Sequence, residues 1–380
     1  MRLINSLVLF LVLYLFYSSH AAAFDQTIFI KQTITNYMQK NNIPGVAVEL
    51  YIDGKPFSYY FGYANYDKKT PMSKHTIFEV GSISKVMTSL LLAQEVDAAK
   101  MQLDDPITKF MPQLPDTYED ITLKNLATHT SGLPFNLPPS VTTQILLEKY
   151  LQKWKPPYEA EDEWQYSNVG IGMLGYSLEA ITHKHFNQLY LTNIAKPLGM
   201  QPIGLFVPHR YQQYVAQGYN QEEQPVKPLQ MKLFYSAGGI KVSAHDMQLF
   251  LRAAIGLPGT PERIFYPMRM TQVAYVELSD NMQGLGWEVN SITYDRIDHL
   301  LKPRPIDLKP IEITEIFDHP VFDGNLLIDK TGMTDGFRSY IALIPNKKSG
   351  IVILTNKRAT DAAIVKVGRE ILFKLAKMEA

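Results

Sequence analysis

Residues 78–85 read Phe-Glu-Val-Gly-Ser-Ile-Ser-Lys, and they contain the only Ser-x-x-Lys in a chain of 380 residues. Apolar residues recur downstream at helical spacing, which predicts a helix that begins at about Ser82. Residues three apart share a helix face, so the Lys85 amine can approach the Ser82 hydroxyl. Ser82 also follows Gly81 at the expected helix start, where free backbone N–H groups and the helix dipole favour a developing oxyanion.

Two interpretations of this pair are open. A serine is a weak nucleophile unless a base lies beside it, and a lysine serves as base only when burial or another cation lowers its pKa. In that case Ser82 would be the nucleophile of an acyl-transfer enzyme. Taken alone, the motif is more typical of a serine that caps a helix, with a solvated lysine one turn further on.

Two later tripeptides have the residue types that some serine acyl-transfer enzymes add to Ser-x-x-Lys. Tyr166-Ser167-Asn168 opens a helix rich in small residues, and Lys330-Thr331-Gly332 lies between two apolar strands. Strand alternation sends Lys330 and Thr331 to opposite sides, so a local twist is needed for both to border one cleft. Other loose matches lie in turns or at a strand end and are interpreted as structural: Tyr63-Ala64-Asn65, Ser279-Asp280-Asn281 and Lys348-Ser349-Gly350.

Strand patterns occupy both ends of the chain, with short helical patterns between them. An apolar run at 46–52, an Asp53-Gly54 turn and a returning strand at 58–63 predict a β-hairpin. Further elements are expected as strands at 325–328, 339–344 and 350–354 and as helices at 27–41 and 361–377. Antiparallel strands with segregated helices indicate an α+β fold, an antiparallel sheet flanked by helices with a helix-rich insertion. We expect a sheet domain from 24–99 and 315–380, a mostly helical domain over 100–314, and the active site between them.

Composition excludes several classes of function. The 37 basic and 37 acidic residues balance, so there is no basic footprint for nucleic acid. With no cysteine, the chain has no disulfide, thiolate nucleophile or Cys-ligated metal. The His183-Lys184-His185 stretch is interpreted as surface histidines, and no nucleotide motif occurs, so neither a metal nor another cofactor is expected.

The first residues have the pattern of a secretory signal peptide. Arg2 is followed by an apolar run over 7–17, too short to span a membrane, and by a small-residue cleavage site at Ala21-Ala22-Ala23. We expect cleavage after about Ala23 and an exported protein without a membrane anchor. Nothing in the sequence indicates an obligate interface, so a monomer is expected.

Taken together, the motifs resemble those of class C (serine) β-lactamases, within the β-lactamase and penicillin-binding superfamily. The order Ser-x-x-Lys, Tyr-x-Asn, Lys-Thr-Gly is similar, and the similarity runs over nearly all of the chain after residue 23. Further similar segments are Thr128–Pro134, Gln283–Glu288, Gly336-Phe337, Ser339-Tyr340, Ile344-Pro345 and Asn356-Lys357. The resemblance implies a periplasmic enzyme that hydrolyses β-lactams, cephalosporins and penicillins alike, without a cofactor.

The resemblance also implies a role for each matching residue. Ser82 would form the acyl-enzyme, and Tyr166 and Lys85 would share the proton transfers, with either of them as the base. The backbone N–H groups of Ser82 and Met333 would form the oxyanion hole. Residues expected to bind substrate are Asn136 and Asn168, at its amide side chain, and Lys330, Thr331 and Arg358, at its carboxylate.

Two departures from the family pattern bear on substrate range. Asn136 stands where the family usually has Gln, and its side chain is one methylene shorter. Arg358 and Asp361 replace an Asn-x-x-Asn pattern near the carboxylate site. Arg358 could bind a carboxylate, whereas Asp361 would repel one unless it pairs with Arg358.

Other functions on the same motifs remain alternatives. A D-alanyl-D-alanine peptidase or a carboxylesterase would use the same Ser82, Lys85 and Tyr166. A penicillin-binding sensor would be acylated without turnover.

Overall fold

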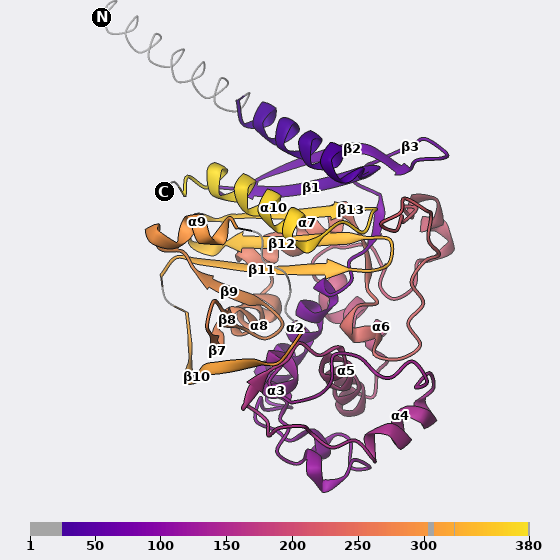
Figure 1. Cartoon of the computed structure of the whole chain (residues 1–380), viewed down its shortest axis with the longest axis vertical. Helices are drawn as coiled ribbons and strands as arrows, with labels where there is room; N and C mark the ends of the chain where they lie inside the picture. The colour runs from indigo at the N-terminus through magenta and orange to yellow at the C-terminus, as the bar shows by residue number, and fades with distance from the viewer. Residues whose placement is uncertain (1–24, 303–307, 323, 379–380) are drawn as a thin grey trace, which may run out of the picture.

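A large antiparallel sheet runs through the molecule (Figure 1). The computed structural model describes residues 25–302, 308–322 and 324–378. Within them the sheet has eleven strands in the order β3-β2-β1-β13-β12-β11-β9-β8-β7-β10-β5. Their bounds are β1 Gly45–Ile52, β2 Lys55–Asn65, β3 Thr70–Pro71, β5 Glu163–Trp164, β7 Ala274–Leu278, β8 Met282–Gln283, β9 Glu288–Ser291, β10 Ile311–Val321, β11 Leu326–Met333, β12 Arg338–Ile344 and β13 Ser349–Thr355.

The turn between β1 and β2 shows how local sequence sets the register. Asp53 and Gly54 both have positive φ, 49° and 74°, as a two-residue hairpin turn requires. Ile52 therefore pairs with Lys55, and the register continues to Gly45 opposite Gly62. The hairpin predicted from Asp53-Gly54 and the α+β fold class are confirmed.

Helices cover both faces of the sheet. Along β13, Ile351 and Ile353 pack with the helix over residues 25–41 and with α10 (Asp361–Leu375), whereas Val352 and Leu354 pack on the opposite side. That opposite side is covered by three helices, α2 (Ile83–Asp97), α7 (Ala244–Ile255) and α8 (Glu262–Gln272). Because both faces are buried, the central strands are continuous apolar runs.

Four further helices gather below the sheet in Figure 1, around α2. They are α3 (Leu123–Thr128), α4 (Gln144–Leu151), α5 (Asn168–Thr182) and α6 (Phe186–Tyr190). A separate two-stranded sheet, β4 (Ile77–Glu79) with β6 (Lys241–Ser243), leads directly into Ser82. The start of α2 thus lies where the sheet meets the helices.

The sheet also takes strands from within residues 100–314, the range predicted to be mostly helical. β5, β7, β8 and β9 come from this range, and β9 pairs with β11. The division into two domains remains a prediction. The predicted signal peptide, residues 1–23, lies outside the described residues.

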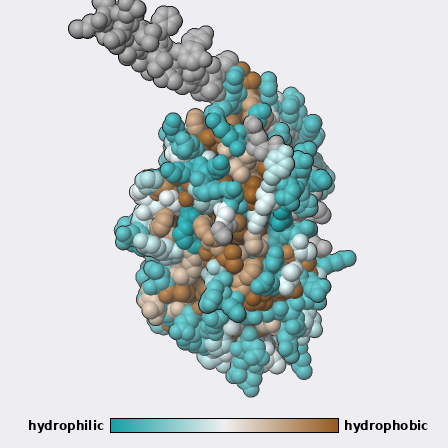
Figure 2. Space-filling model, turned by 90° about the vertical axis from the view of Figure 1, so that its left-hand side faces the viewer, coloured by the Kyte–Doolittle hydropathy of each residue, from teal (hydrophilic) through white to brown (hydrophobic). Residues whose placement is uncertain are grey.

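Figure 2 shows one side of the molecule, where polar residues cover most of the surface and apolar residues form a band near the middle. None of the helices described is both long and apolar enough to cross a membrane.

Candidate active site

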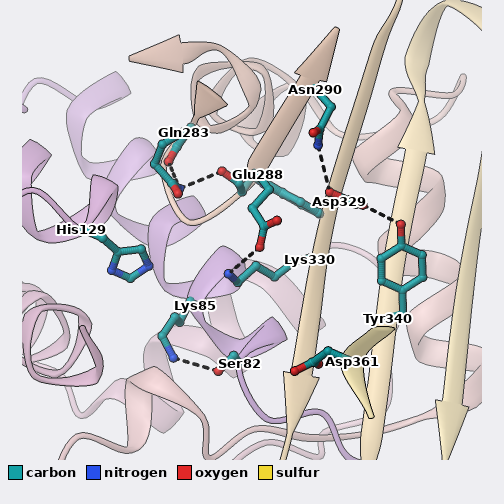
Figure 3. A network of polar contacts seen from close by, with 12 residues as sticks. Ser82, Lys85, His129, Gln283, Glu288, Asn290, Asp329, Lys330, Tyr340 and Asp361 are labelled. Carbon is teal, nitrogen blue, oxygen red and sulfur yellow. Dashed lines mark hydrogen bonds and ion pairs between the residues drawn. The ribbon is translucent and has the colours of Figure 1, made fainter. Parts of the chain in front are cut away.

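Ser82 and Lys85 lie together at the start of α2, as the motif predicts (Figure 3). Lys85 is completely buried, and its Nζ lies 3.0 Å from the Ser82 Oγ. The same Nζ donates hydrogen bonds to Asn168 Oδ1 at 2.6 Å and to the carbonyl oxygen of Ala237 at 2.7 Å. The interpretation of Lys85 as a solvated surface lysine is therefore wrong. Burial lowers the pKa of Lys85, although the neighbouring Tyr166 opposes this shift.

Close backbone packing holds Ser82 against the end of β11. Gly81 has a φ of +51°, and a Cβ there would lie 2.5 Å from the Met333 nitrogen. One residue back, the Val80 carbonyl accepts a hydrogen bond from Ser339 Oγ at 2.8 Å. A Cβ on Gly332 would lie 2.0 Å from that carbonyl oxygen, so a side chain is excluded at both glycines. The nucleophile segment and the backbone of Met333 are thereby brought side by side.

Tyr166 lies between two ammonium groups. Its ring centroid is 4.9 Å from Lys85 Nζ and 4.6 Å from Lys330 Nζ, and the residue is 6% exposed. Burial alone would raise the pKa of Tyr166, but the charges of Lys330 and Lys85 and hydrogen bonds with Ser82 and Lys85 outweigh it. The pKa of Tyr166 is consequently lowered, which favours the phenolate.

Lys330 remains a cation in this site. It is buried in β11, and its Nζ lies 3.6 Å from Glu288 Oε1. Burial would lower the pKa of Lys330, but the negative charges of Tyr166 and Glu288 raise it above its usual value. Thr331 follows in β11, paired with Tyr340 and also buried, and its predicted contact with a substrate carboxylate remains a prediction.

Asn168 connects Lys85 to the loop that carries Asn136. Its Oδ1 accepts from Lys85, and its Nδ2 donates to Asn136 Oδ1 at 2.7 Å. Its backbone N–H donates to the Phe135 carbonyl at 2.8 Å, which ties this loop to the start of α5. The shorter side chain of Asn136 therefore still reaches Asn168.

Sequence reasoning missed the contribution of His129, which lies in a stretch quoted for the family resemblance. His129 is completely buried, and its ring centroid lies 4.5 Å from that of Tyr166. Its Nδ1 accepts a hydrogen bond from the Ser167 backbone N–H at 3.3 Å. Burial and the charges of Lys330 and Lys85 hold the pKa of His129 well below its usual value. His129 thus packs against Tyr166 as a neutral ring.

A buried ion pair on the other side of β11 was also missed. Asp329 accepts hydrogen bonds from Arg369 at 2.7 Å and from the Tyr340 hydroxyl at 2.5 Å. Figure 3 shows Asp329 directed away from Lys330, toward Tyr340. The pair fixes the strand that carries Lys330 to α10. It joins residues about forty positions apart, so no local pattern could indicate it.

Asp361 pairs with a residue that the sequence analysis did not consider. Its Oδ1 forms an ion pair with Arg338 NH1, whereas Arg358 NH1 lies 3.6 Å from Asp335. Asp361 is therefore paired, but with Arg338 rather than with Arg358, the one partner that the sequence had suggested for it. The predicted substrate contact of Arg358 remains a prediction.

The described residues contain no group of three or more His, Cys, Asp or Glu side chains arranged to hold a metal ion. The polar groups that converge on Ser82 are instead an amine, a phenol and amides. Such a set can activate a hydroxyl and stabilise charge on an attacked carbonyl.

Comparisons with known proteins agree with this arrangement. The β-lactamase family model matches residues 30–372. A β-lactamase of Yersinia enterocolitica is 32% identical over 90% of both chains, and one of Escherichia coli K12 is 31% identical over 90% of this chain and 92% of its own. Among solved structures, a class C β-lactamase in complex with cefoxitin has a TM-score of 0.86 at 30% identity, over 91% of this chain and 98% of the other. A β-lactamase/D-alanine carboxypeptidase from Pseudomonas syringae has the same TM-score, identity and coverage.

The fold and these relatives define a serine hydrolase. The chain belongs to the β-lactamase family, and its structural neighbours include class C β-lactamases.

Proposed function

We propose that this enzyme hydrolyses β-lactams, cephalosporins and penicillins, through an acyl-enzyme on Ser82. The observation that carries the proposal is the distance of 3.0 Å between Ser82 Oγ and the buried Lys85 Nζ, beside a Tyr166 whose pKa is lowered. The nucleophile and its proton acceptor are thus assembled before substrate binds.

In the first half of the reaction, Ser82 Oγ attacks the β-lactam carbonyl carbon and its proton passes to Tyr166. The N–H groups of Ser82 and Met333 stabilise the resulting oxyanion. The ring C–N bond then breaks, and the departing nitrogen takes the proton. The product of this half-reaction is an ester on Ser82.

In the second half, a water molecule attacks the ester carbonyl and gives a proton to Tyr166. The bond to Ser82 Oγ breaks, and the proton returns to that oxygen. The released product is the ring-opened acid, and the enzyme regains its starting state.

The lowered pKa of Tyr166 favours Tyr166 over Lys85 as the base. Lys85 Nζ donates to the oxygens of Asn168 and Ala237, and its third contact is with Ser82 Oγ. As a protonated amine, Lys85 would act as a fixed positive charge that stabilises the Tyr166 phenolate.

Substrate would be held at two ends. Asn136 and Asn168 present amide groups at the opening of the site, where they can bind an acylamido side chain. Lys330, Thr331 and Arg358 would bind the carboxylate that β-lactams carry beside the ring. The single cation of Lys330 would therefore serve both Tyr166 and the substrate.

A D-alanyl-D-alanine peptidase activity is the second candidate, because one similar structure carries both names, β-lactamase and D-alanine carboxypeptidase. A carboxylesterase and a penicillin-binding sensor would use the same nucleophile. These alternatives differ in whether water reaches the acyl-enzyme and in what the site admits.

Export to the periplasm is also proposed, with cleavage after about Ala23. It is supported by Arg2, the apolar run at 7–17 and the three alanines that follow. A monomer without nucleic-acid or membrane partners is the matching expectation.

The test is time-resolved intact mass spectrometry of residues 24–380 mixed with a cephalosporin, with ring opening followed by absorbance. A transient adduct with sustained hydrolysis supports a β-lactamase. A long-lived adduct without turnover would instead indicate a peptidase or sensor. No adduct, together with activity on simple esters, would indicate an esterase.

A further inference from the structure

A buried arginine lies under the end of β11, next to the residues proposed to bind the substrate carboxylate. Arg338 begins β12 opposite Met333 and is 4% exposed. Its Nε donates to the Ala359 carbonyl at 2.8 Å, its NH1 pairs with Asp361, and its NH2 lies 3.0 Å from the Met333 sulfur. All three guanidinium nitrogens are therefore engaged, and the side chain is fixed.

Asp361 brings a negative charge to this end of the cleft. It lies in the first turn of α10. Figure 3 shows its carboxylate at the end of β11, directed toward Ser82. Asp361 interacts electrostatically with Lys330 and Arg358 as well as with Arg338. An unpaired carboxylate here would repel an anionic substrate and would compete for the two cations that should bind it.

We infer that Arg338 and Asp361 form a specificity-determining pair, in which Arg338 neutralises Asp361 and leaves Lys330 and Arg358 to bind an anionic group of the substrate. The ion pair that Arg358 makes supports this assignment of Arg338 to Asp361 and of Arg358 to the substrate. Among the residues that the structure describes, the one ion pair of Arg358 is with Asp335, at 3.6 Å, and the Asp335 side chain is 84% exposed. Such a surface pair is weak and is readily exchanged for a substrate carboxylate. The inference rests on the proposed function, because it concerns the same site.

The experiment compares a cephalosporin that has a free carboxylate with its methyl ester, in the wild type and in Arg338→Met. We expect the KM of the acid to rise by about tenfold or more in Arg338→Met. The KM of the ester should change by less than about threefold, because the ester presents no charge to Asp361. An equal rise for both compounds would overturn the inference, since it would indicate a general disturbance of the site.

Two further variants separate charge from structure. In Arg338→Met/Asp361→Asn the unpaired carboxylate is removed, so the KM of the acid should return to within about threefold of the wild type. Asp361→Asn alone retains the arginine and tests the inference if Arg338→Met does not fold. It should keep or lower the KM of the acid and leave that of the ester unchanged. A higher KM for the acid in Asp361→Asn, or no recovery in the double variant, would contradict the inference.

Failure of the proposed function would be distinguishable. In that case the wild type would open the ring of neither compound, and both proposals would be overturned. An active wild type whose variants do not follow this pattern would contradict only the role of the pair.

Discussion

The Lys330 ammonium lies 4.6 Å from the ring centroid of Tyr166, on a lysine that is itself 2% exposed. Because both groups are buried and close together, the charge of each shifts the pKa of the other. The cation lowers the pKa of the phenol, and the phenolate raises the pKa of the amine. The proposed base and the proposed substrate anchor are therefore one electrostatic unit.

Replacement of Lys330 by Met should raise the pKa of Tyr166, because its largest charged stabiliser is removed. The phenolate would then form only at higher pH, so the alkaline shift should appear in the pH profile of kcat. At pH 7 we expect kcat to fall by about a hundredfold or more. Lys347→Met, at an exposed position, is the control and should leave the profile unchanged. An unchanged profile in Lys330→Met would contradict the coupling.

Ser82→Ala should abolish acylation and leave the fold intact. Ser82 is the N-cap of α2 but makes no side-chain capping bond, so the loss of stability should be below about 1 kcal/mol. Ser84→Ala is the matched variant, because the buried Ser84 Oγ accepts a hydrogen bond from the Ile240 N–H. That variant should lose about 1–3 kcal/mol of unfolding free energy and still be acylated. Intact mass measures acylation, and chemical denaturation measures the free energy of unfolding. Acylation of Ser82→Ala would show that Ser82 is not the nucleophile.

Gly81→Ala should slow acylation strongly, since the new Cβ would lie 2.5 Å from the nitrogen of Met333 and push the strand end away from Ser82. Gly199→Ala is the control, with a φ of +72° but nothing within 4 Å of the added atom. It should cost only the left-handed backbone strain, about 1–2 kcal/mol, with normal acylation. Equal rates of acylation in the two variants would show that the close approach at Gly81 is not needed.

The buried carboxyl of Glu49 should make the stability of the folded protein depend on pH. Burial raises the pKa of Glu49 from 4.5 to about 7, although hydrogen bonds from Ser58 and Tyr60 oppose the shift. The folded state thus holds a proton that the unfolded state releases, and stability contributed by this group falls as pH rises from about 4.5 to 7. Glu49→Gln should therefore be more stable than the wild type at pH 8, by up to about 3 kcal/mol, and similar to it at pH 4.

Thermal unfolding at both pH values measures this difference. Glu148→Gln, at an exposed position on α4, is the control and should show no such dependence. If Glu49→Gln gained no stability over the wild type between pH 4 and pH 8, the predicted direction of the pH dependence would be wrong.

Local patterns predicted those parts of the fold that depend on neighbours in sequence. The Asp53-Gly54 hairpin, the helix that starts after Ser82 and the C-terminal helix are of this kind. Strands β7, β8 and β9 were missed because they are short and are stabilised by pairing within the sheet. Their partners cannot be identified from periodicity alone.

The active site likewise contains contacts that follow from sequence spacing and contacts that do not. Ser82 and Lys85 are one helical turn apart, so their contact follows from spacing, whereas the packing of His129 on Tyr166 joins residues from two different loops. The ion pair between Arg338 and Asp361 joins a strand to the start of a helix. No periodicity links such residues, and only the folded chain brings their charges together.

The place of β1 has a consequence for how the protein is made. This first strand lies inside the sheet, with β2 on one side and β13 on the other, and Val46 pairs with Thr355. During synthesis β1 can form its hairpin with β2 early, but its second edge stays open until almost the whole chain has emerged. An open apolar edge is prone to pair with other chains. We therefore expect C-terminal truncations before residue 355 to aggregate rather than to yield a smaller folded enzyme.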